Sequence, residues 1–239
     1  MNHALIFAGG VGARMHSKSL PKQFLLVHGR PIIVHTLEHF QDLSEVDNVV
    51  VVCTRDWISH MKELVAKFRL DKVTKVVPGG KTALESQRIG LRAIEHEGAA
   101  PGDLVLIHDG VRPLIDEDTI RSCLLEAGIH GSAATIAPAT ETIARLDELG
   151  DIASTVERSE CVLARAPQTF RLGEILAAHE RAEKEGLEFV DSASMMIHFG
   201  HKVHAVKGTS ENIKVTTPAD YFICRALLDA RESEQVSGL

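Results

Sequence analysis

The segment ALIFAGGVGARM, residues 4–15, joins a short apolar run to a glycine-rich turn near the start of the chain. ALIF predicts a buried strand, and the glycines let backbone N–H groups converge on an anion without interference from Cβ atoms. Arg14 adds a permanently charged guanidinium group with several N–H donors. Met15 stands where a Rossmann fingerprint has its last glycine, and no Gly-Lys-Ser/Thr follows as in a Walker loop. The segment therefore predicts either a phosphate-binding loop of another type or a structural turn.

Beyond this segment, short β-branched runs alternate with longer amphipathic stretches. A near-continuous apolar run such as VVVVC at 49–53 is typical of a strand covered on both faces. This alternation predicts an α/β fold with a parallel sheet and helices on both faces. The expected strands are 4–7, 49–53, 73–77 and 104–108, and the expected helices are 32–40, 57–68, 82–97 and 116–127.

The pattern changes after residue 140. TIARL at 142–146 and IASTV at 152–156 flank the turn-forming sequence DELGD, which predicts a β-hairpin. Its polarity makes it a poor core element, so we expect it to project from the body. The remaining expected elements are helices at 172–185 and 191–199, a strand at 203–206 and a last helix from Pro218.

Composition excludes several classes of protein. The chain has 239 residues and a formal net charge of −7, with 44% hydrophobic and only 4% aromatic residues. This balance excludes disorder and argues against binding a nucleic-acid backbone, although a few placed cations suffice for a small anion. No run of about 18 apolar residues predicts a membrane span, and the N-terminus lacks the features of a secretory signal. The sequence predicts a cytoplasmic protein that binds neither nucleic acid nor membrane.

The four cysteines support the same compartment. They are far apart, contain no Cys-x-x-Cys pair and lie among apolar neighbours, at positions Cys53, Cys123, Cys161 and Cys224. We interpret them as reduced, buried thiols rather than as disulfides or metal ligands.

Further charged residues stand at the ends of predicted strands. The motif HDGVRP at 108–113 follows a buried strand, where ligands of open α/β sheets bind. Asp109 could hold Mg²⁺ and Arg112 could clamp an anion, or the two could form a structural ion pair. Lys22, eight residues beyond Arg14, could fold back over the same phosphates, although a lysine after proline is usually solvated.

Two more elements complete the set. Gly79-Gly80-Lys81-Thr82, leading to Ser86, forms a second glycine turn at a strand end, and Lys214 lies in the segment NIKVT at 212–216. Each alone is as consistent with a structural role as with a functional one. Together they provide three or more cations, one acid and two glycine turns. That set suits nucleotidyl transfer, in which positioning and charge stabilisation do most of the catalysis and no protein nucleophile is needed.

Other candidate sites are weaker. His35 and His39 form an i, i+4 pair, but no His-Glu-x-x-His motif or acidic third ligand accompanies them, so we interpret them as a helix face. The serines of DSASMM do not form a nucleophile elbow, and Asp191 there predicts a helix cap.

Six motifs in this order, AGGVGARM, PKQFL, HDGVRP, APQTF, DSAS and ENIKVT, closely resemble those of the polyol-phosphate cytidylyltransferases. This family includes the enzymes for 2-C-methyl-D-erythritol 4-phosphate and for ribitol 5-phosphate. The resemblance runs from Ala4 to about Leu228. It implies a single Rossmann-like nucleotidyltransferase domain over residues 1–239, with a protruding β-arm at 139–160 that builds a homodimer. It also implies that CTP and a sugar-alcohol phosphate react, with Mg²⁺, to give a CDP-alcohol and pyrophosphate.

The resemblance also implies roles for individual residues. Arg14, Lys22 and Lys214 would act on the phosphates in catalysis, and Asp109 would lie near the metal and the nucleotide. Arg112 would bind the acceptor, with Thr142 and Arg158 reaching it from the arm of the partner subunit. The residues implied in nucleotide binding are Ala8, Gly9, Gly10, Gly12, Gly80, Lys81, Ser86 and Asp109.

Departures from the family pattern bear on the acceptor. Ala83 and Ala166 stand where the family often has Arg and Thr. The loop Ala8-Gly9-Gly10, the eight-residue spacing to Lys22 and the sequence after Gln168 look more like the ribitol 5-phosphate branch, although Gly110 is typical of neither branch. We therefore expect D-ribitol 5-phosphate as the acceptor, with 2-C-methyl-D-erythritol 4-phosphate as the alternative. A non-catalytic nucleotide-binding module is the remote alternative, and a dehydrogenase would need the missing third glycine.

Overall fold

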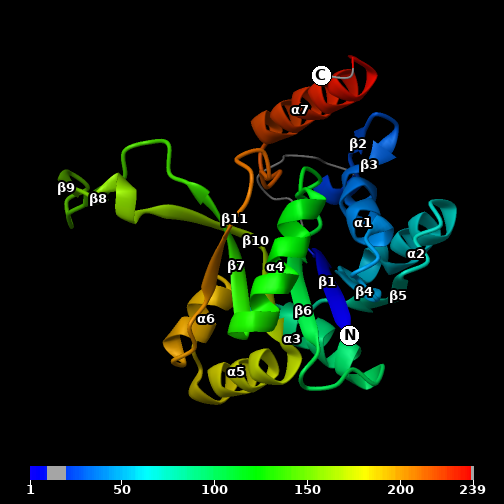
Figure 1. Ribbon diagram of the computed structural model, residues 1–239, viewed down its shortest axis with the longest axis horizontal. Helices are drawn as coiled ribbons and strands as arrows, with labels where there is room; N and C mark the ends of the chain where they lie inside the picture. Colours follow the sequence, from blue (N-terminus) through cyan, green and yellow to red (C-terminus); the bar gives the residue numbers. More distant parts are fainter. Residues whose placement is uncertain (10–19, 238–239) are drawn as a thin grey trace.

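The computed structural model describes residues 1–9 and 20–237. The predicted positions Gly10, Gly12 and Arg14 therefore lie outside the described residues. The described chain forms a seven-stranded sheet in the order β11-β7-β10-β6-β1-β4-β5, with helices on both faces (Figure 1). Its strands are β1 (Asn2–Ala8), β4 (Asn48–Cys53), β5 (Val73–Pro78), β6 (Leu104–Asp109), β7 (Ser132–Pro138), β10 (Val162–Arg171) and β11 (His204–Lys207).

The helices confirm the predicted alternation, with bounds that differ from the expected ones by a few residues at most. They are α1 (Ile32–Asp42), α2 (Ile58–Lys67), α3 (Ala83–His96), α4 (Glu117–His130), α5 (Leu172–Glu185), α6 (Ser192–His198) and α7 (Pro218–Ser237). Short 3₁₀ turns are η2 (Lys22–Phe24), η3 (Arg55–Trp57) and η4 (Arg158–Glu160), and the small pairs are β2 (Leu26–Val27) with β3 (Arg30–Pro31) and β8 (Ala144–Leu146) with β9 (Ile152–Thr155).

The sheet is mostly parallel, as predicted. Strand β1 lies between β4 and β6 and pairs in parallel with both. Strand β10 runs antiparallel to both of its neighbours, β6 and β7, while the edge strand β11 pairs in parallel with β7. Consecutive apolar residues face opposite sides: in β4, Val49 and Val51 pack in one core cluster and Val50 and Val52 in the other.

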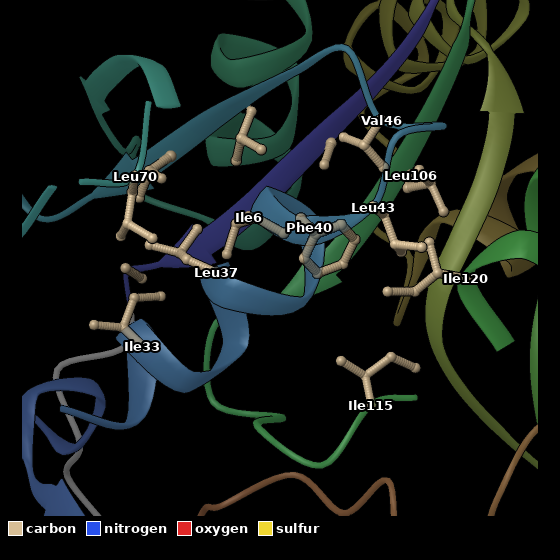
Figure 2. Packing of buried hydrophobic residues seen from close by; sticks show 14 of the residues in the cluster. Ile6, Ile33, Leu37, Phe40, Leu43, Val46, Leu70, Leu106, Ile115 and Ile120 are labelled. Atoms are coloured by element: carbon tan, nitrogen blue, oxygen red, sulfur yellow. The ribbon is translucent and has the colours of Figure 1, made fainter. Parts of the chain in front are cut away.

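One of these two cores lies under α1, α2 and α4. Figure 2 shows Leu37 and Phe40 of α1 beside Ile6 of β1 and Leu106 of β6. The second core packs α3, α5 and α6 on the opposite face of the sheet. Because helices cover both faces of the sheet, side chains at the ends of the strands are the ones that can reach a ligand.

Two strands of the main sheet, β7 and β10, were not expected from the sequence. Strand β7 is rich in small residues of low strand propensity, SAATIAP. Strand β10 contains Pro167, which argues against a central strand because proline lacks an N–H. The pairing of β10 with β7 shifts register between Ala164 and Gln168, so Pro167 lies where the ladder is already interrupted.

The predicted hairpin is present as β8 and β9, which pair Ala144 with Thr155. It projects sideways from the body (Figure 1). Three apolar side chains on it are largely solvent-exposed, Leu146 at 65%, Leu149 at 89% and Ile152 at 71%. These side chains belong to an arm that has no core of its own in the described chain.

The remaining general predictions concern membranes and thiols. Across residues 1–9 and 20–237, none of the helices combines the length and the hydropathy needed to cross a bilayer. All four cysteines are free thiols; Cys53, Cys123 and Cys224 are buried, and Cys161 is partly exposed. Burial raises the pKa of the three buried thiols to about 11, so they remain protonated.

Candidate active site

A cleft of about 550 Å³ lies at the carboxyl ends of the parallel strands. Among the described residues that line it, five carry a positive charge and two are carboxylic acids. These residues are Lys22, Lys81, Arg112, Arg165 and Lys214, with Asp109 and Asp191. The cleft also includes Ala8, Gly9, Gly80 and Ser86. Nine of the predicted site positions therefore meet in one place, and the excess of cations favours an anionic ligand.

Asp109, the last residue of β6, is the electrostatic centre of the cleft. Its Oδ2 accepts a hydrogen bond from Arg112 Nε at 2.8 Å, and its Oδ1 is 2.7 Å from Lys214 Nζ. The next residue, Gly110, donates its N–H to the Phe7 carbonyl, and a Cβ there would lie 2.7 Å from that oxygen. Glycine is required because β6 meets β1 so closely at this point.

These two cations decide the charge of Asp109. Burial alone would raise the pKa of this carboxyl group, but Lys214 and Arg112 outweigh it and hold the pKa at about 2. Neighbouring His108 is buried on the other side of the strand end, and burial lowers its pKa to about 3. At neutral pH the site therefore contains an ionised Asp109 and a neutral imidazole behind it.

Lys214 reaches the cleft because the segment after β11 is tied to the β6–α4 loop. Val215 is buried and donates its N–H to the Val111 carbonyl at 2.9 Å. Buried Asn212 donates its side-chain amide to the Ala166 carbonyl at 2.7 Å. The segment is not a strand, so it is these contacts, rather than strand alternation, that direct Lys214 toward Asp109.

The glycine turn between β5 and α3 is braced from within. Thr82 caps α3 by accepting from the Glu85 N–H at 3.1 Å, while the Lys81 N–H donates to Glu85 Oε2 at 2.6 Å. Ser86 Oγ accepts from the Gly80 N–H at 3.0 Å and donates to the Thr82 carbonyl at 2.8 Å. These hydrogen bonds hold the turn in shape before a ligand binds, and the Ser86 hydroxyl group makes two of them.

Lys22 lies on η2, eight residues beyond Arg14. The residue is 9% exposed, so most of it, including the aliphatic stem, is covered although it lines the cleft. The adjacent Gln23 is buried and donates to the Ala8 carbonyl at 2.6 Å. This bond ties η2 to the end of β1, which places Lys22 on the same side of the sheet as Asp109.

Sequence analysis did not identify Arg165, which lies on β10. Arg165 Nη1 and Arg112 Nη1 both donate to the Asn212 carbonyl. Burial lowers the pKa of Arg165, and so does the nearby charge of Arg112. Within the described chain Arg165 forms no ion pair with a carboxylate, so two guanidinium groups share one neutral acceptor beside the cleft. Because β10 itself was not expected, its side chains had no predicted position.

Gln168 was noted only as part of the motif. Its Oε1 accepts from the Ala193 N–H at 2.9 Å and its Nε2 donates to Asp191 at 2.7 Å. Asp191 caps α6, as predicted, by accepting from the Ser194 N–H at 2.8 Å. These bonds fix the wall of the cleft formed by β10 and α6.

Thr142 and Arg158 do not line this cleft. Thr142 is exposed at the base of the arm, and Arg158 donates to the Thr140 carbonyl at 3.3 Å. Arg158 lines a separate hollow of about 450 Å³ with Cys161 and Lys207. Their predicted contact with the acceptor involves a partner subunit, so their role stays a prediction.

Comparison with known proteins decides the family. Residues 2–230 match the family model described as "IspD: 2-C-methyl-D-erythritol 4-phosphate cytidylyltransferase". The chain belongs to this cytidylyltransferase family. It is therefore a nucleotidyltransferase, as predicted.

Proteins similar to this cytidylyltransferase include enzymes with two different names. It is 45% identical, over 100% of both chains, to a ribitol-5-phosphate cytidylyltransferase of Streptococcus agalactiae serotype III (strain NEM316). It is 40% identical, over 97% of this chain and 98% of the relative, to a 2-C-methyl-D-erythritol 4-phosphate cytidylyltransferase of Geotalea uraniireducens (strain Rf4). A solved 4-diphosphocytidyl-2C-methyl-D-erythritol synthase from Anaerococcus prevotii DSM 20548 has a TM-score of 0.81 and 25% identity, covering 95% of this chain and 98% of that one.

Proposed function

We propose that this enzyme transfers the cytidylyl group of CTP to D-ribitol 5-phosphate, giving CDP-ribitol and pyrophosphate. The observation that carries the proposal is the cleft in which Lys22, Lys81, Arg112, Arg165 and Lys214 face two carboxylates. Both substrates are polyanions, and a chain with a net charge of −7 concentrates its cations where they would bind.

The reaction is an in-line displacement. A phosphate oxygen of the acceptor attacks the α-phosphorus of CTP; the new O–P bond forms as the bond to the bridging oxygen of pyrophosphate breaks, and that oxygen leaves with the bond's electrons. Negative charge grows on the α-phosphate and on the leaving group. Lys22 and Lys214 would stabilise this charge, and so would Arg14, which lies outside the described residues. No covalent enzyme intermediate is needed.

Asp109 is the residue that would hold Mg²⁺. It is ionised at neutral pH and sits among phosphate-binding cations, and Mg²⁺ commonly binds one or two carboxylates together with substrate phosphates. The donor set therefore fits, with Asp109 sharing its oxygens between the ion and Lys214 or Arg112. When bound, Mg²⁺ would neutralise phosphate charge; Asp109 would also keep Lys214 oriented.

The acceptor assignment is supported by the 45% identity to ribitol-5-phosphate enzymes over the whole chain, against 40% for the methylerythritol enzyme of Geotalea uraniireducens. The test is pyrophosphate release with CTP and Mg²⁺, each acceptor supplied separately. Turnover with ribitol 5-phosphate supports the proposal. Turnover only with 2-C-methyl-D-erythritol 4-phosphate overturns the acceptor, and CTP binding without turnover for either would favour a non-catalytic module.

We also propose a homodimer built through the arm and a cytoplasmic location. The exposed Leu146, Leu149 and Ile152 on the hairpin support the first, because such side chains are commonly covered by a partner. Free cysteines are consistent with the second. Sedimentation equilibrium at micromolar concentration tests the dimer, and a monomer there contradicts it.

A further inference from the structure

Two histidines and a glutamate meet on the surface where the last turns of α4 face the edge strand β11. Glu126 and His130 are four residues apart on α4 and share one face of it, and His204 is the first residue of β11. Glu126 Oε2 is 3.3 Å from His130 Nε2 and 3.4 Å from His204 Nε2. The three ligand atoms all lie within 4.8 Å of one another. None of these residues lines the cleft that contains Asp109.

The two distances from Glu126 Oε2 to the imidazole nitrogens match those between neighbouring ligands of a tetrahedral metal centre. Bonds of about 2.0–2.2 Å to nitrogen and oxygen at tetrahedral angles place neighbouring ligand atoms about 3.3–3.5 Å apart. The two imidazole rings are stacked, with centroids 4.1 Å apart and planes 8° from parallel. A metal lies near the plane of each imidazole that binds it, so one ring would turn about its side-chain bonds on binding. The side chains of His130 and His204 are 45% and 42% exposed, which gives them freedom to turn.

We propose that Glu126, His130 and His204 form a second metal site, selective for Zn²⁺ and similar transition-metal ions. Two imidazoles and one carboxylate suit Zn²⁺, Co²⁺ or Ni²⁺, whereas Mg²⁺ prefers oxygen ligands alone. Three protein ligands leave a fourth position for water. The site differs in chemistry and in place from the magnesium site proposed at Asp109.

Metal at this position would join two elements that are distant in sequence. Strand β11 is the edge of the sheet as described and pairs with β7, with His204 opposite Ala133. A bond from His204 to a metal held by α4 would fasten this edge strand to the helix that covers it. The chain continues from β11 into the segment that carries Asn212 and Lys214. Zn²⁺ would therefore stabilise the fold without entering the catalytic cleft.

The test uses Co²⁺ and Zn²⁺ on the full-length protein without substrates. Co²⁺ titration should give the visible absorption of a four-coordinate site at one ion per chain. Zn²⁺ at about 100 times its Kd should raise Tm by about 5–10 °C. His204→Gln and His130→Gln should each abolish the Co²⁺ spectrum and the Zn²⁺ shift. His60→Gln is the matched control, since His60 pairs with Glu63 on α2 at 3.7 Å without a second imidazole from another element.

Three results would overturn the site. One is a wild-type protein with neither the four-coordinate spectrum nor a Zn²⁺-dependent shift in Tm. Another is a spectrum and shift that persist in both His204→Gln and His130→Gln, which would place the ion elsewhere. The third is an equal loss of spectrum and shift in His60→Gln. Excess Mg²⁺ should not displace the Co²⁺ signal, which separates this site from the one at Asp109.

Discussion

Lys22 is the residue whose charge we expect to matter most in the transition state. Its stem is covered and its turn is tied to β1 through Gln23, so the ammonium group is held in place before substrate binds. Lys22→Ala should lower kcat about 10²–10³-fold, as for other preorganised charge-stabilising groups, with little change in CTP affinity. Pyrophosphate release at saturating substrates measures kcat, and calorimetric titration measures CTP binding.

The matched control for this change is Lys62→Ala, an exposed lysine on α2. It should leave both quantities unchanged. Near-normal turnover in Lys22→Ala would remove the residue from the chemistry, and weaker CTP binding with kcat unchanged would assign it to ground-state binding.

Arg165 is expected to contribute to acceptor binding. It lies beside Arg112, lines the cleft and has no carboxylate partner in the described chain, so an incoming phosphate would supply its counter-charge. Arg165→Met should raise the KM for the polyol phosphate about tenfold or more while leaving the KM for CTP nearly unchanged. In Arg165→Lys the KM for the polyol phosphate should lie between the values for wild type and Arg165→Met, because lysine keeps the charge but lacks the paired N–H donors of a guanidinium group. A rise confined to the KM for CTP would contradict this role.

At this scale, sequence reasoning found residues that belong to short local motifs. Lys22, Asp109 and Lys214 lie in the motifs PKQFL, HDGVRP and ENIKVT, and the structure places all three in the cleft. Arg165 and the bracing role of Asn212 depend on two distant segments meeting across β10. His130 and His204 also come together only through tertiary structure, since they lie on different elements. The pair that stands out by sequence spacing is His35 and His39, and each of these lies close to a backbone carbonyl.

Among the elements, those with strong periodicity were predicted well. Helix α5 has the expected bounds 172–185, and the buried strands β4 and β6 were recognised as apolar runs. Strands β7 and β10 were missed because their composition carries little strand signal and one contains a proline. Strand β10 is stabilised by tertiary pairing rather than by local strand propensity, because it lies between β6 and β7 and forms hydrogen bonds with both.

The arm is the element whose function a mixing experiment can test. If Arg158 acts on the active site of a partner subunit, a heterodimer of Lys22→Ala and Arg158→Ala chains contains one site with both residues intact. Mixing the two inactive homodimers under exchange conditions should restore pyrophosphate release. If Arg158 acts within its own chain, each site keeps one defect and the mixture stays inactive. Pairing Lys22→Ala with Asp109→Asn, both on the body, is the control that should show no recovery.

Over the whole molecule, charge is distributed unevenly. The net charge is −7, yet the described cleft lining has more cations than carboxylates. Of the two carboxylates that line the described cleft, Asp109 is ion-paired to cleft cations, namely Arg112 and Lys214, and Asp191 is not. The stability of the apo protein therefore depends on keeping that one carboxylate ionised, since protonation would leave several neighbouring positive charges without a counter-charge.

This dependence predicts how stability changes with pH. The pKa of Asp109 is about 2 in the folded protein, because Lys214 and Arg112 overcome the effect of burial, against about 3.9 in an unfolded chain. A lowered pKa contributes stability that is fully present above the unfolded value and is lost as the pH falls toward the folded one. Asp109→Asn should therefore have a lower free energy of unfolding than wild type at pH 7, and the difference should stay constant down to about pH 5 and shrink between about pH 4 and pH 2. Urea unfolding across this range measures it, with Asp118→Asn, an exposed acid on α4, as the control. A difference that is unchanged by pH would mean that the asparagine acts through packing rather than through charge.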